Sequence, residues 1–287
     1  MAMQMLSKNT VTNKFTFEAK GFKPAELESA ILCIEIGKDF FNYALFSKNK
    51  DVLALKSMQS QQYGVTGVLP SLFIESDKLV QHSFSKVYIS IADVPYTIVP
   101  NAFYAEEDKA SYLHFATGAQ NNQSILSDDI SRSESKLIYS IDKNIKEQLD
   151  NYYPNHHLIS TISNQLNNIP VAKKNKAAAY LNFRRDSVDL ILVKDKVVFC
   201  NSFSVISPED LIYFVLSSLE LNSFEVQDTQ FVIYGETETN SLWIKLMKKY
   251  IKHIDFACIE KQFKKPLEIN NMPSHYYYHL INLIHCA

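Results

Sequence analysis

Glycine is scarce in this chain of 287 residues, which contains six glycines and four cysteines. The cysteines, Cys33, Cys200, Cys258 and Cys286, are far apart and lie mostly in apolar runs, which indicates buried reduced thiols rather than a disulfide or metal-binding framework. No run of about 18 apolar residues occurs, and the first twenty residues lack the apolar segment of a signal peptide. The sequence therefore predicts a cytoplasmic protein without a transmembrane segment.

Motifs of established catalytic chemistry are absent as well. The chain has no GxGxxG, GxxxxGK(S/T) or GxSxG pattern, and no cysteine or serine is placed with a recognisable histidine partner. The formal net charge of −2 provides no basic field to attract a phosphate backbone. We therefore assign no catalytic residue and expect no nucleic-acid partner.

The composition is otherwise that of an ordinary globular protein, with 46% hydrophobic and 21% charged residues. The length exceeds what one hydrophobic core usually fills, which favours two lobes. We predict an N-terminal extension over 1–30, a first lobe over 31–175 and a second lobe over 176–287.

Two similar blocks appear when the sequence is compared with itself at an offset of 147 residues. They run from Cys33 to Phe46 and from Tyr180 to Val193, and each reads as strand, polar turn, strand. Polar and apolar positions coincide, as in the pairs Ile34 and Leu181, Lys38 and Arg185, Asp39 and Asp186, and Asn42 and Asp189. A third strand follows each block, so both halves are predicted to open with a three-stranded meander, an internal duplication.

The second half continues with a helix, a strand, a helix and a strand. Ser207-Pro-Glu-Asp210 combines a capping serine with proline at the first helical position, and it predicts a helix from Pro208 to about Leu221. We expect a strand over Gln230–Gly235, a helix over Ser241–Ile251 and a short strand near Ile254–Cys258.

The first half begins with the same order of helices and strands and then differs from it. A helix around Val68–Val80 and a strand at Lys86–Ala92 are followed by a strand over Pro95–Val99 and a helix over Ala105–Phe115. The segment Thr117 to Ser135 is rich in Asn, Gln, Ser and Asp and predicts a mobile loop inserted in the first lobe. Further elements are expected at Lys136–Ile141 (strand), Asp142–Asn151 (helix), His157–Ile162 (strand) and Asn164–Lys174 (helix).

These meander-and-crossover halves resemble the duplicated ribonuclease H-like fold of actin, Hsp70 and the sugar kinases. More closely, the chain resembles an uncharacterised bacterial family with an actin-like ATPase fold and, more distantly, actin-like pilus-assembly and secretion proteins. The segments that carry this resemblance are Ala92 to Phe103 and the meander over 178–206. The resemblance implies an α/β protein of two ribonuclease H-like lobes, with mixed sheets flanked by helices.

The resemblance also implies a nucleotide site, of which the chain keeps a part. The superfamily places Asp-x-Gly in each first hairpin, with an acid for hydrated magnesium and a glycine that lets the backbone approach phosphate. Glu35-Ile36-Gly37 stands at the first of these positions, whereas Asn182-Phe183-Arg184 stands at the second and lacks both acid and glycine. The nearest match to the paired glycines at the adenosine is Gly235-Glu236.

Each of these candidates has a plain structural alternative. Glu35 is either a carboxylate that faces magnesium-bound water or a strand-end residue bonded to backbone or to Lys38. The cations Lys38, Arg184 and Arg185 at the hairpin tips either converge on phosphate or are solvated turn charges.

Histidines and aromatics near the C-terminus suggest two other roles. His275 and His279 have the i, i+4 spacing of zinc ligands, with His285 and Cys286 nearby, but an amphipathic terminal helix explains them better. The aromatic runs Tyr276–Tyr278 and Phe103–Tyr104 are candidates for an interaction surface, although core packing explains most of the aromatic content.

Together these features favour a protein whose nucleotide site has decayed and which binds an unidentified protein partner or acts as a scaffold, rather than an enzyme. The alternative is a functional actin-like protein that closes its lobes on Mg-ATP, with ATP and magnesium as cofactors and at most weak ATPase activity. A small-molecule phosphotransferase would need a catalytic Asp that the sequence does not place.

Overall fold

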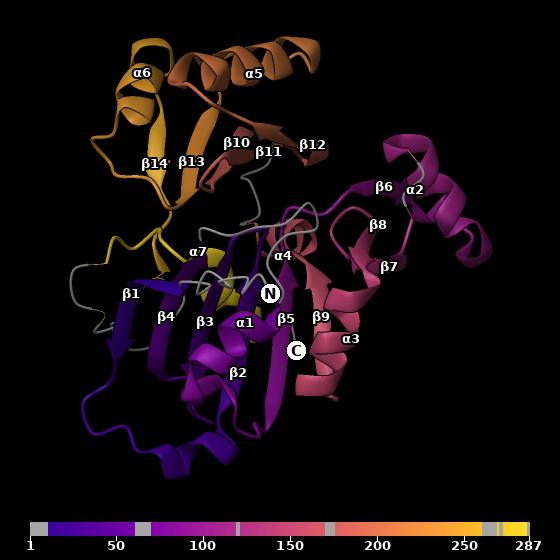
Figure 1. Cartoon of the computed structure of the whole chain (residues 1–287). Coiled ribbons are helices and arrows are strands. Elements are labelled where there is room, and N and C mark those ends of the chain that lie inside the picture. Colours follow the sequence, from indigo (N-terminus) through magenta and orange to yellow (C-terminus); the bar gives the residue numbers. More distant parts are fainter. Residues whose placement is uncertain are drawn as a thin grey trace, which may run out of the picture. The chain divides into compact units, whose positions relative to one another are not determined.

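The structure is a computed structural model, and it describes residues 11–60, 70–118, 121–169, 176–259, 269 and 272–285. The chain divides into two compact units, whose elements are drawn in Figure 1. One unit comprises Met1–Asn167 with Leu280–Ala287, and the other comprises Asn168–His279. The division differs from the predicted lobes, because the second unit begins before residue 176 and the last residues belong to the first unit.

The first unit is built on a six-stranded sheet in the order β1-β4-β3-β2-β5-β9. The strands β1 to β4 pair antiparallel, while β2, β5 and β9 run parallel. Their bounds, in sheet order, are Val11–Glu18, Val52–Ser60, Phe40–Phe46, Ile31–Ile36, Lys86–Ile91 and His156–Ser160. The segment predicted as an N-terminal extension therefore supplies the edge strand β1 and the 3-10 helix η1 (Pro24–Ser29).

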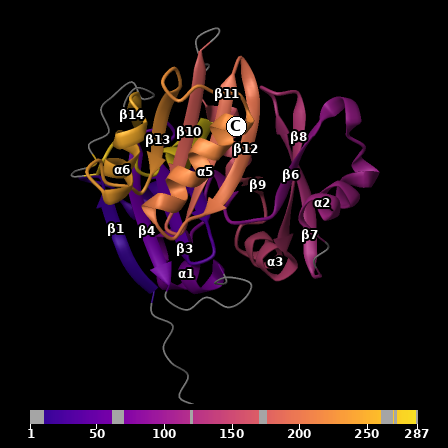
Figure 2. The ribbon, with the colours of Figure 1, turned by 90° about the horizontal axis from the view of Figure 1, so that it is seen from above.

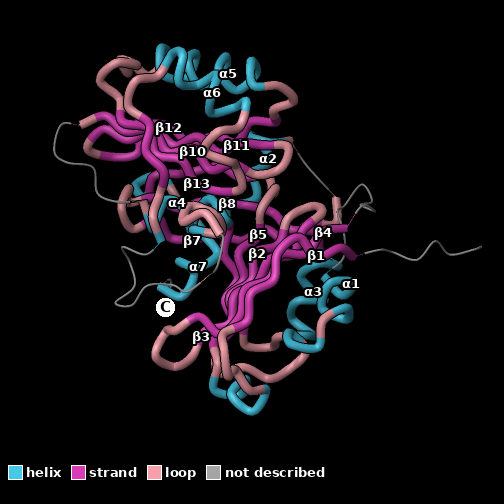
Figure 3. The backbone as a smooth tube through the Cα atoms, turned by 90° about the vertical axis from the view of Figure 1, so that its left-hand side faces the viewer, coloured by secondary structure: helices cyan, strands magenta, loops and turns pink. Residues whose placement is uncertain are grey.

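Helices cover both faces of this sheet. Helices α1 (Pro70–Ser76) and α3 (Lys143–Tyr152) lie on one face, and α7 (Tyr278–Asn282) lies on the other (Figure 3). The 3-10 helix η6 (Leu283–His285), which follows α7, contacts β2 and β5. The predicted helix over Val68–Val80 is interrupted at Asp77, an extended residue whose carboxylate accepts a bond from the backbone of Leu79 and opens η2 (Lys78–Val80).

A three-stranded antiparallel sheet, β6-β8-β7, completes the first unit. Helix α2 (Lys109–Thr117) packs against this sheet, preceded by η3 (Asn101–Phe103) and η4 (Glu106–Asp108). Helix α4 follows β9 directly and buries most of its side chains. The bounds of the remaining elements are Tyr96–Pro100 (β6), Gln123–Ile130 (β7), Ser135–Asp142 (β8) and Thr161–Asn168 (α4).

The prediction of a mobile loop over Thr117–Ser135 is wrong for residues 123–130, which form a strand, whereas residues 131–134 form the turn between β7 and β8. Strand β7 pairs with β8 along its whole length, from Gln123 opposite Asp142 to Ile130 opposite Ser135. The polar residues that suggested a loop lie on an edge strand, where water and neighbouring segments satisfy them. Residues 119 and 120 lie outside the described part of the chain.

One of these polar residues, Asp128, is held in a partly buried position. Its Oδ2 accepts a bond of 2.8 Å from the backbone N–H of Ser160, at the end of β9. Burial raises the pKa of the Asp128 carboxyl from 3.8 to about 6. The hydrogen bond therefore ties the small sheet to the main sheet through a carboxyl whose pKa is raised.

This raised pKa predicts a pH-dependent stability. The folded state holds the proton of Asp128 more tightly than the unfolded state, so the free energy of unfolding falls as the pH rises from about 4 to about 6. The loss amounts to about 2 to 3 kcal/mol and should be absent in Asp128→Asn, which keeps an oxygen for Ser160 but carries no charge. Urea denaturation of both proteins across this pH range measures it, and parallel pH profiles would contradict the assignment.

The second unit contains a five-stranded sheet in the order β12-β11-β10-β13-β14. Helices α5 and α6 lie over one face of it, as the two views of Figures 1 and 2 agree. The bounds are Ala177–Phe183 (β10), Ser187–Lys194 (β11), Lys196–Ser204 (β12), Pro208–Leu221 (α5), Gln230–Gly235 (β13), Leu242–Tyr250 (α6) and Ile254–Phe256 (β14). The core between sheet and helices is apolar, with Leu181, Leu190, Val215 and Phe231 among its buried residues.

The predicted meanders and crossovers are confirmed in both units. The order β4-β3-β2-β5-β9 of the first sheet repeats in β12-β11-β10-β13-β14 of the second, with an antiparallel meander followed by two parallel strands. Helix α5 has the predicted bounds because Ser207 and Asp210 form a capping box at its start. The fold is therefore an α/β arrangement of mixed sheets flanked by helices. Among the described residues, no helix is long and apolar enough to cross a membrane.

Candidate functional site

In the first unit, Glu35 belongs to a row of polar residues that crosses four strands of the sheet. On β2 it lies opposite Asn42 of β3 and Ser90 of β5, and Asn42 lies opposite Ser57 of β4. All four side chains are buried, and Glu35 is 9% exposed. Such a row is unusual, because the neighbouring positions of β2, β3 and β5 are apolar.

This row faces away from α1 and α3. The next residue on β3, Tyr43, points to the opposite face, where its hydroxyl donates a 2.9 Å bond to Asp77. Alternation along a strand therefore turns Asn42 and its neighbour Glu35 toward the face that carries α7. On this face Ser90 exchanges a 2.8 Å hydroxyl bond with Thr161, the first residue of α4.

Gly37 and Lys38 follow Glu35 in the turn between β2 and β3. The ring of Phe40 fills the space beside Gly37, so that a Cβ atom there would lie 2.0 Å from the ring. The Lys38 side chain is exposed, while its backbone N–H donates a 3.2 Å bond to Oδ2 of Asp93. A phosphate-binding glycine would leave space for the phosphate beside its backbone. At Gly37 the ring of Phe40 fills that space.

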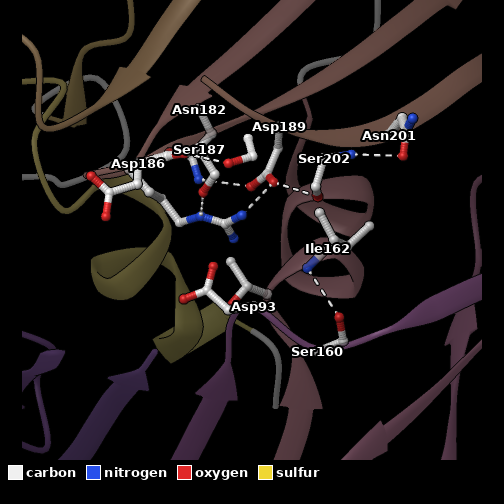
Figure 4. A network of polar contacts seen from close by, with 12 residues as sticks. Asp93, Ser160, Ile162, Asn182, Asp186, Ser187, Asp189, Asn201 and Ser202 are labelled. Carbon is white, nitrogen blue, oxygen red and sulfur yellow. Dashed lines mark hydrogen bonds and ion pairs between the residues drawn. The ribbon is translucent and has the colours of Figure 1, made fainter. Parts of the chain in front are cut away.

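In the second unit, Asn182 belongs to a corresponding row of polar residues. It lies opposite Asp189 of β11, which lies opposite Ser202 of β12. Asn182 donates a 3.2 Å bond to Oδ2 of Asp189, and the Ser202 hydroxyl donates a 2.7 Å bond to its Oδ1 (Figure 4). Asp189 is fully buried, at 0% exposure.

Arg184 provides the positive charge that this buried carboxylate requires. Its Nη2 lies 2.8 Å from Oδ1 of Asp189, and its Nε donates a 3.1 Å bond to the Ser187 hydroxyl. The Arg184 side chain is itself only 10% exposed. Arg185, by contrast, is exposed, with its Nε at 4.0 Å from Asp186. The two adjacent arginines therefore have different roles, one internal and one on the surface.

The polar rows of the two units carry the same pair of functional groups in exchanged positions. The first unit has Glu35 on the first strand of its meander and Asn42 on the second; the second unit has Asn182 on the first strand and Asp189 on the second. Sequence comparison paired Asn42 with Asp189 but gave neither a role. The hairpin register places Asp189 beside Asn182 and near Arg184. This register is the signal that would have revealed the role of Asp189.

Gly235 and Glu236 lie at the end of β13. Gly235 has a φ of +84°, and a Cβ atom there would lie 2.0 Å from the carbonyl oxygen of Phe183. The backbone N–H of Glu236 donates a 3.1 Å bond to this same oxygen, while the Glu236 side chain is exposed. Glycine is therefore required at position 235 because the backbones of β13 and β10 lie close together there.

The C-terminal histidines do not share a helical face. Tyr277 adopts a φ of +51°, so the helix begins only at Tyr278 and excludes His275. Nε2 of His275 lies 2.7 Å from the carbonyl oxygen of Thr237. His279 is buried, and desolvation together with the charge of Arg184 lowers its pKa to about 3. No cluster of three or more potential metal ligands occurs in the described part of the chain, which excludes Cys286.

The structure therefore gathers the candidate residues in two sets. Glu35, Gly37 and Lys38 occupy the end of β2 and its turn in the first unit. The second unit holds the other five at the neighbouring ends of β10 and β13: Asn182, Arg184, Arg185, Gly235 and Glu236.

Comparison with known proteins places the chain in a family. Residues 19–254 match the family described as "Protein of unknown function (DUF3822)". The chain belongs to this family. No curated protein matches the sequence.

Solved structures show the fold. A Bacteroides thetaiotaomicron protein of unknown function with an actin-like ATPase fold superposes with a TM-score of 0.72 at 18% identity, covering 92% of this chain and 98% of its own. A chain of the PilM-PilN type IV pilus biogenesis complex superposes with a TM-score of 0.61 at 11% identity, covering 90% and 98%. This member of the DUF3822 family therefore has an actin-like ATPase fold, as the resemblance of its sequence implied.

Proposed function

We propose that this protein is a cytoplasmic partner-binding or scaffolding protein of actin-like fold, in which a duplicated ribonuclease H-like architecture retains a degenerate nucleotide site. The observation that carries the proposal is the ion pair between Arg184 and Asp189. In a working site an acid at the position of Asn182 would hold the water shell of a metal ion, and its charge would be left for that ion. Here the neighbouring acid, Asp189, is neutralised by Arg184 and also accepts bonds from Asn182 and Ser202.

Two glycines support the same conclusion. A phosphate-binding glycine leaves space for the ligand to approach the backbone. The space at Gly37 is filled by the ring of Phe40, and the space at Gly235 by the carbonyl of Phe183. Each glycine is thus explained by a contact within the protein.

The partner-binding part of the proposal follows from the similarity in fold. A chain of similar fold belongs to the PilM-PilN complex, an assembly in type IV pilus biogenesis. When an actin-like protein loses nucleotide binding, its outer surface is still present. That surface can bind another protein, which is the function we propose here.

A second candidate function is Mg-ATP binding with interlobe closure, and one observation favours it. Glu35 keeps a buried carboxylate at the end of β2, where Asn42 and Ser90 flank it. An acid retained at this position would suit magnesium-bound water, with weak ATPase activity as a consequence.

Thermal unfolding with and without Mg-ATP separates the two functions. A ligand present at about a thousandfold excess over its Kd adds about 4 kcal/mol to the free energy of unfolding, which raises the Tm by roughly 10 °C in a protein of this size. We expect about 5 mM Mg-ATP to raise the Tm by less than about 1 °C.

Magnesium sulfate at matched ionic strength and the variant Glu35→Gln are the controls. Glutamine keeps the shape of Glu35 but carries no charge, so it removes only an interaction with a cation. A rise of several degrees that requires both ATP and magnesium, and that Glu35→Gln abolishes, would refute the degenerate site and support the second function.

A further inference from the structure

The segment before α2 and the helix itself expose an aromatic surface. Phe103 is 74% exposed and Phe115 is 95% exposed. Tyr112 connects them, because its hydroxyl donates a 2.7 Å bond to the carbonyl oxygen of Phe103 and it lies one helical turn before Phe115. We refer to these three residues as the α2 surface.

Folding of the first unit does not require the two phenylalanines at these positions. Helix α2 packs against β6, β7 and β8, and its buried residue is Leu113, which contacts Val99 and Ile138. Phe115 lies on a different side of the helix and leaves nearly all of its ring in water. An almost fully exposed phenylalanine on the solvent side of a packed helix is expected where a second molecule packs.

Acidic residues lie between Phe103 and α2 in the chain. Glu106, Glu107 and Asp108 form η4, directly before α2. Glu106 is paired with Lys109 and also accepts a bond from the Tyr104 hydroxyl. The carboxylates of Glu107 and Asp108 are exposed and have no ion pair among the residues that the structure describes. Asp108 is the N-cap residue of α2, so both carboxylates lie at the start of the helix that carries Phe115.

From this arrangement we infer that the α2 surface docks a basic amphipathic segment of a partner protein, with its apolar side chains on Phe103 and Phe115 and its lysines or arginines beside Glu107 and Asp108. The inference rests on the proposed partner-binding function and names the chemistry of the partner. Charge decides between occupants, because the acids repel anionic lipid and nucleic acid. A second copy is disfavoured too, since a two-fold contact would bring the same acids together.

The experiment uses a defined probe, a fluorescent 18-residue helical peptide of leucine and lysine in an amphipathic pattern. A matched peptide with glutamate in place of lysine is the charge control. Fluorescence anisotropy measures binding to the full chain, and chemical shifts of backbone amides report where the peptide binds. We expect the lysine peptide to bind, with shifts concentrated in residues 101–117, and the glutamate peptide to bind at least about tenfold more weakly.

Variants locate the interaction further. The double variant Phe103→Ser and Phe115→Ser should weaken binding of the lysine peptide at least about tenfold, as loss of exposed anchors does. The double variant Glu107→Lys and Asp108→Lys should weaken it similarly and reduce its dependence on salt. Ile206→Ser with Leu221→Ser is the matched control, because these residues are 92% and 84% exposed on the second unit, and it should bind like the unchanged protein.

Absence of lysine-peptide binding, equal binding of the two peptides, or unchanged affinity in the phenylalanine variant would overturn the inference. Dimerisation lost in the phenylalanine variant, seen by sedimentation, would also overturn it in favour of a second copy. All peptide measurements are made without nucleotide. Tight Mg-ATP binding would therefore refute the degenerate site and leave the α2 surface untouched, whereas a failed peptide titration would leave the degenerate site standing.

Discussion

Replacing Arg184 by alanine is expected to lower the free energy of unfolding of the second unit by about 3 to 5 kcal/mol. The change leaves the carboxylate of Asp189 at 0% exposure without the cation that lies 2.8 Å away. Asn182 and Ser202 still donate to it, but neutral donors do not offset the cost of burying a charge. The single tryptophan, Trp243, lies in α6 of this unit, so its fluorescence during urea denaturation reports the loss.

Two further variants make the result specific. Arg185→Ala should change stability by less than about 1 kcal/mol, because that side chain is exposed and exposed ion pairs contribute little. The double variant Arg184→Ala with Asp189→Asn should recover part of the loss, since it buries no charge. If Arg184→Ala and Arg185→Ala were equally mild, Arg184 would not be an internal counterion, and the main support for a degenerate site would fall.

Replacing Gly235 by alanine is the second change with a large expected effect, a loss of about 2 to 6 kcal/mol. The residue has a φ of +84°, where a side chain is strained by about 1 to 3 kcal/mol. In addition the new Cβ would lie 2.0 Å from the carbonyl oxygen of Phe183, a backbone atom that moves only with β10. Overpacking of this kind typically adds about 1 to 3 kcal/mol. Circular dichroism during urea denaturation measures the sum.

Gly118→Ala is the matched control for this variant. Gly118 has a similar φ of +80° at the end of α2, but among the described residues, its chain neighbours aside, no atom lies within 4 Å of the place where a Cβ would be. It should therefore show the backbone strain alone. Equal losses for the two variants would mean that the contact between β13 and β10 is not what requires glycine, and the space at Gly235 would again be open to a nucleotide.

Much of the fold was predictable because its signals are local and repeated. The polar and apolar pattern of β2 and β3 recurs in β10 and β11, and the capping residues at Ser207 fixed the start of α5. The mobile loop was a wrong prediction because polarity alone does not separate a loop from an edge strand. The partner of β7 is β8, whose register cannot be read from the composition of β7.

The candidate site was predictable in its positions but not in its contacts. Sequence comparison found Glu35, Asn182 and Arg184 because they occupy motif positions. It did not reveal that Arg184 pairs with Asp189 or that Phe40 fills the space beside Gly37. These contacts depend on how side chains of the two strands of a hairpin face one another. The motif covers only the first strand, so it does not predict them.

Isothermal calorimetry of ATP titrated into the full chain, with and without magnesium, tests the degenerate site most directly. Because the site is degenerate, we expect no detectable heat of binding at millimolar ATP in either condition. Micromolar, magnesium-dependent binding that Glu35→Ala abolishes would contradict it.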